Sequence, residues 1–259
     1  MSPLSPLRRV VAYRAALGLL AARHLKLRYR RSVLGFVWTF AYPLLAMTVL
    51  TIVFRPVFRQ VPDYGLYVLV GLLVWQFFSV SCLQAMDALL GSASVARKVY
   101  VPTAIFPLAA VTANLVNLTL CLTAIPLMVV GSGAAPGFHP FALLYGVALL
   151  AAFTAGVSLT LSALNVFFQD VRYLFEALLL VWFYATPIMY PVDGAASATA
   201  ALVAVNPLHW ILLVLRAALW SGDGVPLSAV IVGGLTACGA LVGGWHAYCV
   251  AERRFHQYL

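Results

Sequence analysis

The chain has 259 residues, of which 64% are hydrophobic and only 9% are charged. Such a chain cannot enclose its apolar side chains in one water-soluble core, so the composition predicts a polytopic membrane protein. The formal net charge is +9, but the basic residues lie beside apolar stretches and form no soluble basic face. We therefore expect these basic residues to interact with anionic membrane lipids and not with nucleic acid.

The first 31 residues hold half of the positive charge and no acidic residue. Lys and Arg next to membrane helices stay in the cytoplasm, which predicts a cytoplasmic N-terminus. Residues 1–32 are expected to form an interfacial amphipathic helix, because Arg23, Lys26 and Arg30 recur on one helical face. The pattern is imperfect, so two interpretations stay open. The segment either only orients the protein, or docks a pyrophosphate-bearing lipid through its arginines.

Six apolar stretches are long enough to cross a bilayer. They cover residues 34–54, 66–86, 104–130, 141–168, 173–190 and 227–250. Six crossings from a cytoplasmic N-terminus also leave the C-terminus in the cytoplasm, and 13 of the 16 Lys and Arg residues then lie on that side. The connecting loops are short, so residues 1–259 are predicted to form a single all-α membrane domain.

Aromatic residues are concentrated in the first predicted span. Phe36, Trp38, Phe40 and Tyr42 are spaced by two residues, so their rings cover several sides of a helix. Aromatic faces suit the apolar faces of sugar rings, which favours a channel lining. Trp and Tyr near a membrane boundary also serve as interface anchors, and both interpretations stay open.

Two cytoplasmic connections carry charge. Residues 92–102 resemble a short helix with two adjacent basic residues and a closing proline. This segment is either a contact through which a soluble partner moves the membrane helices, or an ordinary loop. Asp170 and Arg172 lie in a tight turn, with Glu176 four residues after the arginine. We expect an ion pair that shapes this turn, since no second intramembrane carboxylate is present for a proton relay.

The predicted outer side contains interrupted helices. Prolines break the chain in residues 185–191 and 206–210, and the apolar run 207–220 is too short to cross the membrane. Residues 191–226 are therefore predicted to form an outer gate with short re-entrant helices. In the last span, Gly239 and Gly243 would permit close helix approach, either within one subunit or between two.

No catalytic or metal centre is predicted. The only lysines, Lys26 and Lys98, lack the preceding glycines of a phosphate-binding loop. The five histidines are scattered singly, and the four cysteines have no CxxC spacing. We therefore expect no catalytic centre and no cofactor bound to this chain.

Five segments together resemble the membrane subunit of ABC-2 type exporters, particularly those that move O-antigen, teichoic acid and related lipid-linked polysaccharides. The segments are LRYRRSVLGFVWTFAYP (27–43), RKVYVP (97–102), QDVRY (169–173), TPIMYP (186–191) and NPL (206–208). The resemblance runs over nearly the whole chain. It implies a homodimer in the bacterial inner membrane, bound to two copies of a cytoplasmic ABC ATPase that holds ATP and Mg.

The resemblance also implies four groups of site residues. ATPase coupling would involve Ser92, Arg97, Lys98, Tyr100, Pro102, Asp170 and Arg172. The lipid pyrophosphate would engage Arg28, Arg30 and Arg31. The polymer channel would be lined by Phe36, Trp38, Phe40, Tyr42, Trp75 and Phe78. The outer gate would include Pro187, Tyr190, Pro191, Asn206 and Arg216.

Three alternatives remain beside the polysaccharide exporter. Related ABC-2 subunits export drugs or small lipids. An ion-coupled secondary transporter would need membrane-embedded ion sites, usually in two related halves, for which Glu176 is the best lone candidate. A membrane enzyme acting on lipid-linked sugars would need clustered carboxylates, histidines or metal ligands, which this sequence lacks.

Overall fold

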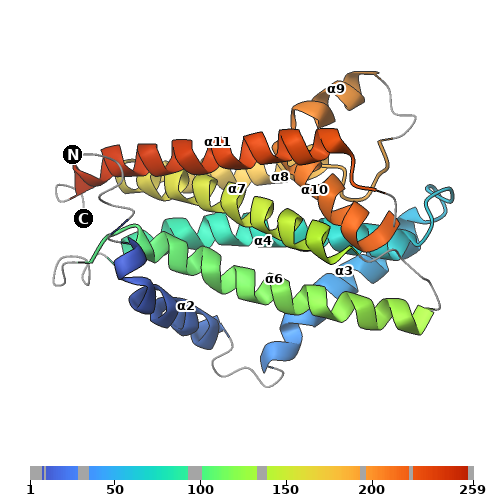
Figure 1. Cartoon of the computed structure of the whole chain (residues 1–259), viewed down its shortest axis with the longest axis horizontal. Helices are drawn as coiled ribbons and strands as arrows, with labels where there is room; N and C mark the ends of the chain where they lie inside the picture. The colour runs from blue at the N-terminus through green and yellow to red at the C-terminus, as the bar shows by residue number, and fades with distance from the viewer. Residues whose placement is uncertain are drawn as a thin grey trace.

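The computed structural model describes residues 8, 10–28, 35–92, 101–132, 139–192, 197–221 and 224–255. Within these ranges the chain is helical and contains no strand (Figure 1). The elements are α2 (Arg14–Arg28), the 3-10 turn η1 (Gly35–Val37), α3 (Trp38–Phe54), α4 (Tyr64–Gly91), α6 (Ile105–Ser132), α7 (Pro140–Phe167), α8 (Asp170–Ala185), α9 (Ser197–Val205), α10 (Pro207–Arg216), the π-helical turn η2 (Ala217–Ser221) and α11 (Leu227–Glu252).

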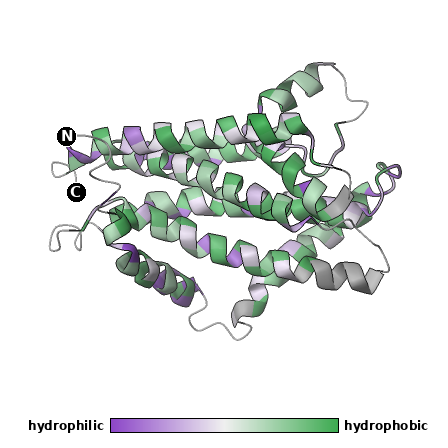
Figure 2. Ribbon diagram, viewed as in Figure 1, coloured by the Kyte–Doolittle hydropathy of each residue, from purple (hydrophilic) through white to green (hydrophobic). Residues whose placement is uncertain are grey.

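The membrane character follows from four long apolar helices, whose green colour dominates Figure 2. By length and composition α4, α6, α7 and α11 can cross a bilayer. Helices α9 and α10 meet at an angle of 90°, and this bent pair would make a fifth span. Helices α3 and α8 occupy the first and fifth predicted stretches, but have only 17 and 16 residues. The six-span arrangement therefore stays a prediction.

Helix α4 lies at the centre of the bundle, against α3, α6, α7 and α10. Aromatic rings fill the space between it and its neighbours. The ring of Phe78 stacks on Phe153 with centroids 5.7 Å apart, and meets Trp182 edge-on at 5.0 Å. Lipid tails are as apolar as these side chains, so shape complementarity, more than the hydrophobic effect, holds such helices together.

Helices α7 and α11 make the closest helix contact, because glycines face each other. A Cβ atom on Gly156 would overlap the carbonyl of Ala240, and one on Gly244 would overlap the carbonyl oxygen of Gly156. The predicted close approach through Gly239 and Gly243 is wrong within the subunit, since nothing lies within 4 Å of an added Cβ at either position. These two glycines point away from α7, and their use between subunits stays a prediction.

Helix α2 lies beside α6 on the outside of the bundle (Figure 1). Val10 and the partly buried Leu17 and Leu20 pack in a cluster with Phe106 and Ala110 of α6. This contact fixes the position of Arg28, the last residue of α2. The predicted helix over residues 1–32 is therefore present over 14–28, while residues 29–34 lie outside the described ranges.

Candidate functional site

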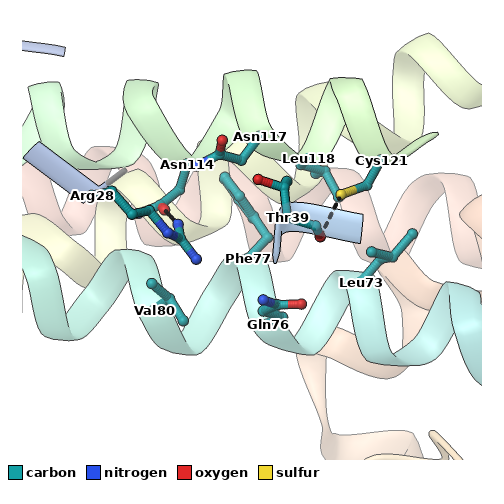
Figure 3. Close-up of a pocket in the computed structure, with 10 residues that line it drawn as sticks. All are labelled: Arg28, Thr39, Leu73, Gln76, Phe77, Val80, Asn114, Asn117, Leu118 and Cys121. Carbon is teal, nitrogen blue, oxygen red and sulfur yellow. Dashed lines mark hydrogen bonds between the residues drawn. The ribbon is translucent and has the colours of Figure 1, made fainter. Parts of the chain in front are cut away.

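Arg28 joins α2 to two central helices through a chain of hydrogen bonds. Its Nη1 donates to Oδ1 of Asn114 on α6 at 3.1 Å (Figure 3). The Nδ2 of Asn114 donates in turn to Oε1 of Gln84 on α4 at 2.9 Å, and to the carbonyl of Ala110 at 3.1 Å. One exposed arginine is thereby tied to two amide side chains inside the helix bundle.

Two sizeable cavities meet at Arg28. One, of about 450 Å³, lies between α2, α4 and α6 and is lined by Arg23, His24, Gln84 and Asn114 among others. We call it the basic cavity. Burial and the neighbouring Arg23 lower the pKa of His24, so the positive charge of this cavity at pH 7 comes from Arg23 and Arg28. The carboxylate of Asp87 also lines the cavity and is paired with Arg172.

The second cavity is an open groove of about 910 Å³ between α3, α4 and α8. Arg28 lines this aromatic groove as well, together with Trp38, Tyr42, Trp75 and Phe183. Trp75 and Phe183 meet edge-on with centroids 5.4 Å apart. The groove thus combines aromatic faces with one cation, a pairing that suits a polar molecule with apolar ring faces.

The structure brings some of the predicted channel aromatics together and separates others. Trp38, Tyr42 and Trp75 line the groove, whereas Phe40 packs against the buried core. Phe78 is fully buried, so its ring fills the core and does not line the groove. The side chain of Phe36 lies outside the described residues. Phe183 was missed, because an apolar residue in a predicted span gives no sign of facing a groove.

Two of the predicted coupling residues, Ser92 and Pro102, lie beside the ends of α4 and α6. Arg97, Lys98 and Tyr100 lie outside the described residues, as do Arg30 and Arg31 of the predicted pyrophosphate site. Ser92 ends α4 and lines the basic cavity. Pro102 precedes Thr103 at the start of α6.

Thr103 is fixed to the last turn of α11. Its backbone N and its Oγ1 donate to Oε1 of Glu252 at 3.2 and 2.6 Å, and the hydroxyl of Tyr248 donates to Oγ1 at 3.0 Å. Tyr248 is fully buried. The segment that follows the predicted coupling region is therefore held against α11. Sequence reasoning missed this contact, because the residues are about 150 positions apart.

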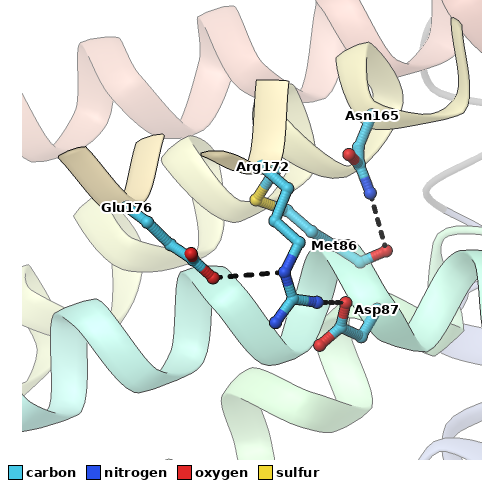
Figure 4. A network of polar contacts seen from close by, with 5 residues as sticks. All are labelled: Met86, Asp87, Asn165, Arg172 and Glu176. Atoms are coloured by element: carbon cyan, nitrogen blue, oxygen red, sulfur yellow. Dashed lines mark hydrogen bonds and ion pairs between the residues drawn. The ribbon is translucent and has the colours of Figure 1, made fainter. Parts of the chain in front are cut away.

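The predicted ion pair at the start of α8 is confirmed and has a further member. The Nε of Arg172 pairs with Oε1 of Glu176 at 3.2 Å, and its Nη1 pairs with Asp87 at the end of α4 (Figure 4). Nearby, Nδ2 of Asn165 on α7 donates to the carbonyl of Met86 at 3.5 Å. Asp170 lies in the first turn of α8, where the helix dipole stabilises a negative charge.

Removing this ion pair is expected to have a small effect on stability. The side chains of Arg172 and Asp87 are 37% and 51% exposed, and exposed pairs contribute less than about 1 kcal/mol. Arg172→Gln should therefore shift the melting temperature of the purified protein by no more than the control Arg253→Gln, an exposed arginine at the end of α11. Thermal unfolding followed by tryptophan fluorescence measures both. A clearly larger loss in Arg172→Gln would contradict this expectation.

At the opposite end of the bundle, Asn206 connects α8 to α10. Its Oδ1 accepts from the backbone N of Leu208 and from Nε1 of Trp182, both at 3.0 Å. Its Nδ2 donates to the carbonyl of Ala185 at 3.2 Å and to Oγ1 of Thr186 at 2.8 Å. Asn206 is the N-cap of α10, and the same side chain fixes the end of α8.

The segment after α8, which we call the outer loop (residues 186–192), is held by α4 and α10. The hydroxyls of Tyr64 and Tyr67 donate to the carbonyls of Met189 and Tyr190 at 2.5 and 2.9 Å. Nη2 of Arg216 donates to the carbonyls of Ile188 and Tyr67 at 2.9 and 3.3 Å. The Arg216 guanidinium also lies 3.5 Å from the centroid of the Tyr67 ring, which is a cation–π contact.

The residues predicted for the outer gate thus lie in one place. Pro187, Tyr190 and Pro191 belong to the outer loop, while Asn206 and Arg216 fix it from the two ends of α10. Sequence reasoning missed Tyr64, Tyr67 and Trp182. Tyrosines at the beginning of a membrane span are usually interface anchors, so nothing marked these two as donors to a loop more than 120 residues away.

Comparison with known proteins agrees with these features. The family described as ABC-2 type transporter matches residues 15–220. An O-antigen export system permease protein RfbA of Myxococcus xanthus is 32% identical over 97% of this chain and 96% of its own length. A protein of the same name from Klebsiella pneumoniae is 30% identical over 74% of each chain. This chain therefore belongs to the ABC-2 type transporter family.

Proposed function

We propose that this protein is the transmembrane subunit of an ABC exporter that moves a lipid-linked polysaccharide, like O-antigen or teichoic acid, out of the cytoplasm. It is a multi-pass protein of the inner membrane, as its family and apolar helices indicate. One observation carries the substrate class: Arg28 lines both a basic cavity and an aromatic groove. An anionic lipid diphosphate and a neutral glycan chain need these two environments side by side.

The energy would come from a separate subunit. ABC-2 membrane subunits transport, while ATP and Mg bind to an ATP-binding partner, so this chain would need no cofactor and no catalytic residue of its own. Residues 92–102 would contact that partner. The hydrogen bonds from Thr103 to Glu252 support this role, since they would transmit a displacement of the segment directly to α11.

The working unit would be a homodimer with two ATPase copies. In this arrangement α3 and α8 complete six crossings, both termini are cytoplasmic, and residues 191–226 with the outer loop close the far side. The exposed rings of Trp38 and Tyr42 on α3 support a second copy opposite the aromatic groove. The glycan would pass between the two subunits, and the diphosphate would engage Arg28 with Arg30 and Arg31.

Reconstitution tests the proposal. The protein and its ATPase are inserted together into liposomes, with polyprenyl-diphosphate-linked glycan on the ATPase side. ATP is expected to move the glycan to the side where an added glycosidase cannot reach it. An ATPase variant that binds but does not hydrolyse ATP should block this movement.

Two results would overturn the proposal. Transport that continues without ATP hydrolysis would indicate an ion-coupled transporter. ATP-driven movement of small lipids or drugs, without movement of the glycan, would indicate the other class of ABC-2 exporter.

A further inference from the structure

Amide side chains lie where the basic cavity and the aromatic groove approach each other. Gln84 and Asn114 line the basic cavity, and Gln76 lines the groove. Between them lies a small cavity of about 30 Å³, lined by Arg28, Gln76, Asn114 and others (Figure 3). Arg28 is the residue common to all three spaces. The amides therefore lie where the two larger cavities come together.

The position of these amides is unusual for apolar helices. Asn114 is nine residues into α6 and only 4% exposed, and polar residues so placed in membrane helices usually serve a pathway or a site. A carboxamide offers two N–H donors and a carbonyl acceptor. Neighbouring hydroxyls of a sugar need that combination, because each hydroxyl both donates and accepts.

We propose that Gln76, Gln84 and Asn114 form a carbohydrate site for the sugar attached directly to the lipid diphosphate. The inference rests on the proposed function and adds the residues that recognise the first sugar of the substrate. The hydrogen bond from Arg28 to Asn114 is the substrate-free arrangement. A phosphate oxygen replaces Asn114 as the acceptor for Arg28, since hydrogen bonds between two ionised groups are the stronger ones. Oδ1 of Asn114 is then available to a sugar hydroxyl.

The distances between these side chains allow Arg28 to bind the diphosphate while the amides bind the first sugar. Arg28 and Asn114 are 3.1 Å apart, and Asn114 is 2.9 Å from Gln84, so a diphosphate held by Arg28 places its first sugar next to both amides. The basic cavity, at about 450 Å³, is within the usual range of about 300–1,000 Å³ for small-ligand sites. Beyond Gln76, Trp75 offers an aromatic face to the following sugar.

The test compares two probes bound to the complete transporter, with its ATPase, in phosphatidylcholine nanodiscs. One probe is a polyprenyl diphosphate bearing a single N-acetylhexosamine, and the other is the same lipid without sugar. Inorganic pyrophosphate, as a competitor, distinguishes recognition of the diphosphate alone. The wild type should bind the sugar-bearing lipid about tenfold more tightly than the bare lipid, which corresponds to one or two hydrogen bonds.

The variants distinguish recognition of the sugar from recognition of the diphosphate. Asn114→Leu and Gln84→Met should abolish the preference for the sugar-bearing lipid, whereas Arg28→Gln should weaken binding of both lipids. Asn165→Leu is the matched control, because Asn165 is also a buried amide that connects two helices but lies outside the three cavities. It should keep the tenfold preference.

The outcomes distinguish this inference from the proposed function. A wild type without sugar preference, or Asn114→Leu and Gln84→Met variants that keep it, would overturn the carbohydrate site and leave the exporter assignment intact. Competition by inorganic pyrophosphate as strong as that by the sugar-bearing lipid would also overturn it. Absence of binding by either lipid to the wild type would overturn the lipid-linked substrate itself.

Discussion

Gly156→Ala is expected to prevent normal folding of the protein. The added methyl group would overlap the carbonyl of Ala240 and the backbone N of Leu241, so relief requires movement of a whole helix and not of a flexible side chain. Overpacking in a well-packed interior costs about 1–3 kcal/mol or more, and contact with backbone atoms places this site at the upper end. We expect a fall in the yield of monodisperse protein and in its melting temperature.

Gly239→Ala is the matched control on α11. An added Cβ there has no atom within 4 Å, and alanine is a better helix former than glycine by about 1 kcal/mol. This variant should be at least as stable as the wild type. Gly244→Ala, whose Cβ would overlap the carbonyl oxygen of Gly156, should behave like Gly156→Ala. Equal stability of all three variants would contradict the close contact between α7 and α11.

The positions of the six helices in the apolar stretches, α3, α4, α6, α7, α8 and α11, could be predicted from hydropathy. Each predicted apolar stretch contains one helix, and every end agrees within five residues. The reason is physical: a backbone in an apolar environment must satisfy its hydrogen bonds internally, so an apolar run of this length becomes a helix.

The rotation of each helix about its own axis could not be predicted in the same way. A membrane helix that is apolar on all sides has no stripe to indicate which face packs inward. For this reason the sequence pointed to Gly239 and Gly243, whereas the close contact lies at Gly244, and it placed Phe78 in a channel although this ring is fully buried. Which side of a span meets a neighbour depends on contacts between distant segments.

The amide residues were missed for a different reason. Gln84 and Asn114 stand inside apolar stretches, and a search for charged clusters and metal ligands passes over neutral side chains. Yet an amide inside a membrane span is costly unless it has a partner. The Asn and Gln residues inside the predicted spans include both of these positions. The contact of Asn114 with Arg28 could not be predicted from the sequence, because it joins residues 86 positions apart.

Arg216→Met is expected to loosen the outer loop and to make the resting transporter leaky. Arg216 is 5% exposed and satisfies the carbonyls of Ile188 and Tyr67. Methionine fills a similar volume but donates no hydrogen bond. The Tyr67 carbonyl keeps its bond within α4, whereas the Ile188 carbonyl loses the Arg216 donor, which costs about 1–3 kcal/mol. Without ATP, liposomes containing Arg216→Met should release a small entrapped dye faster than those with the wild type, and the melting temperature should fall.

Three further variants identify the source of this effect. Arg216→Lys keeps the charge but loses the planar fork of donors, so an intermediate leak is expected. Tyr67→Phe removes the hydroxyl that donates to Tyr190 but keeps the ring beneath the guanidinium and the Arg216 bond to Ile188, so its leak should be smaller than that of Arg216→Met. Arg59→Met removes an exposed arginine that donates to the nearby Pro56 carbonyl, and it should match the wild type. If Arg59→Met leaks as much as Arg216→Met, positive charge alone governs closure and the hydrogen bonds to the outer loop do not.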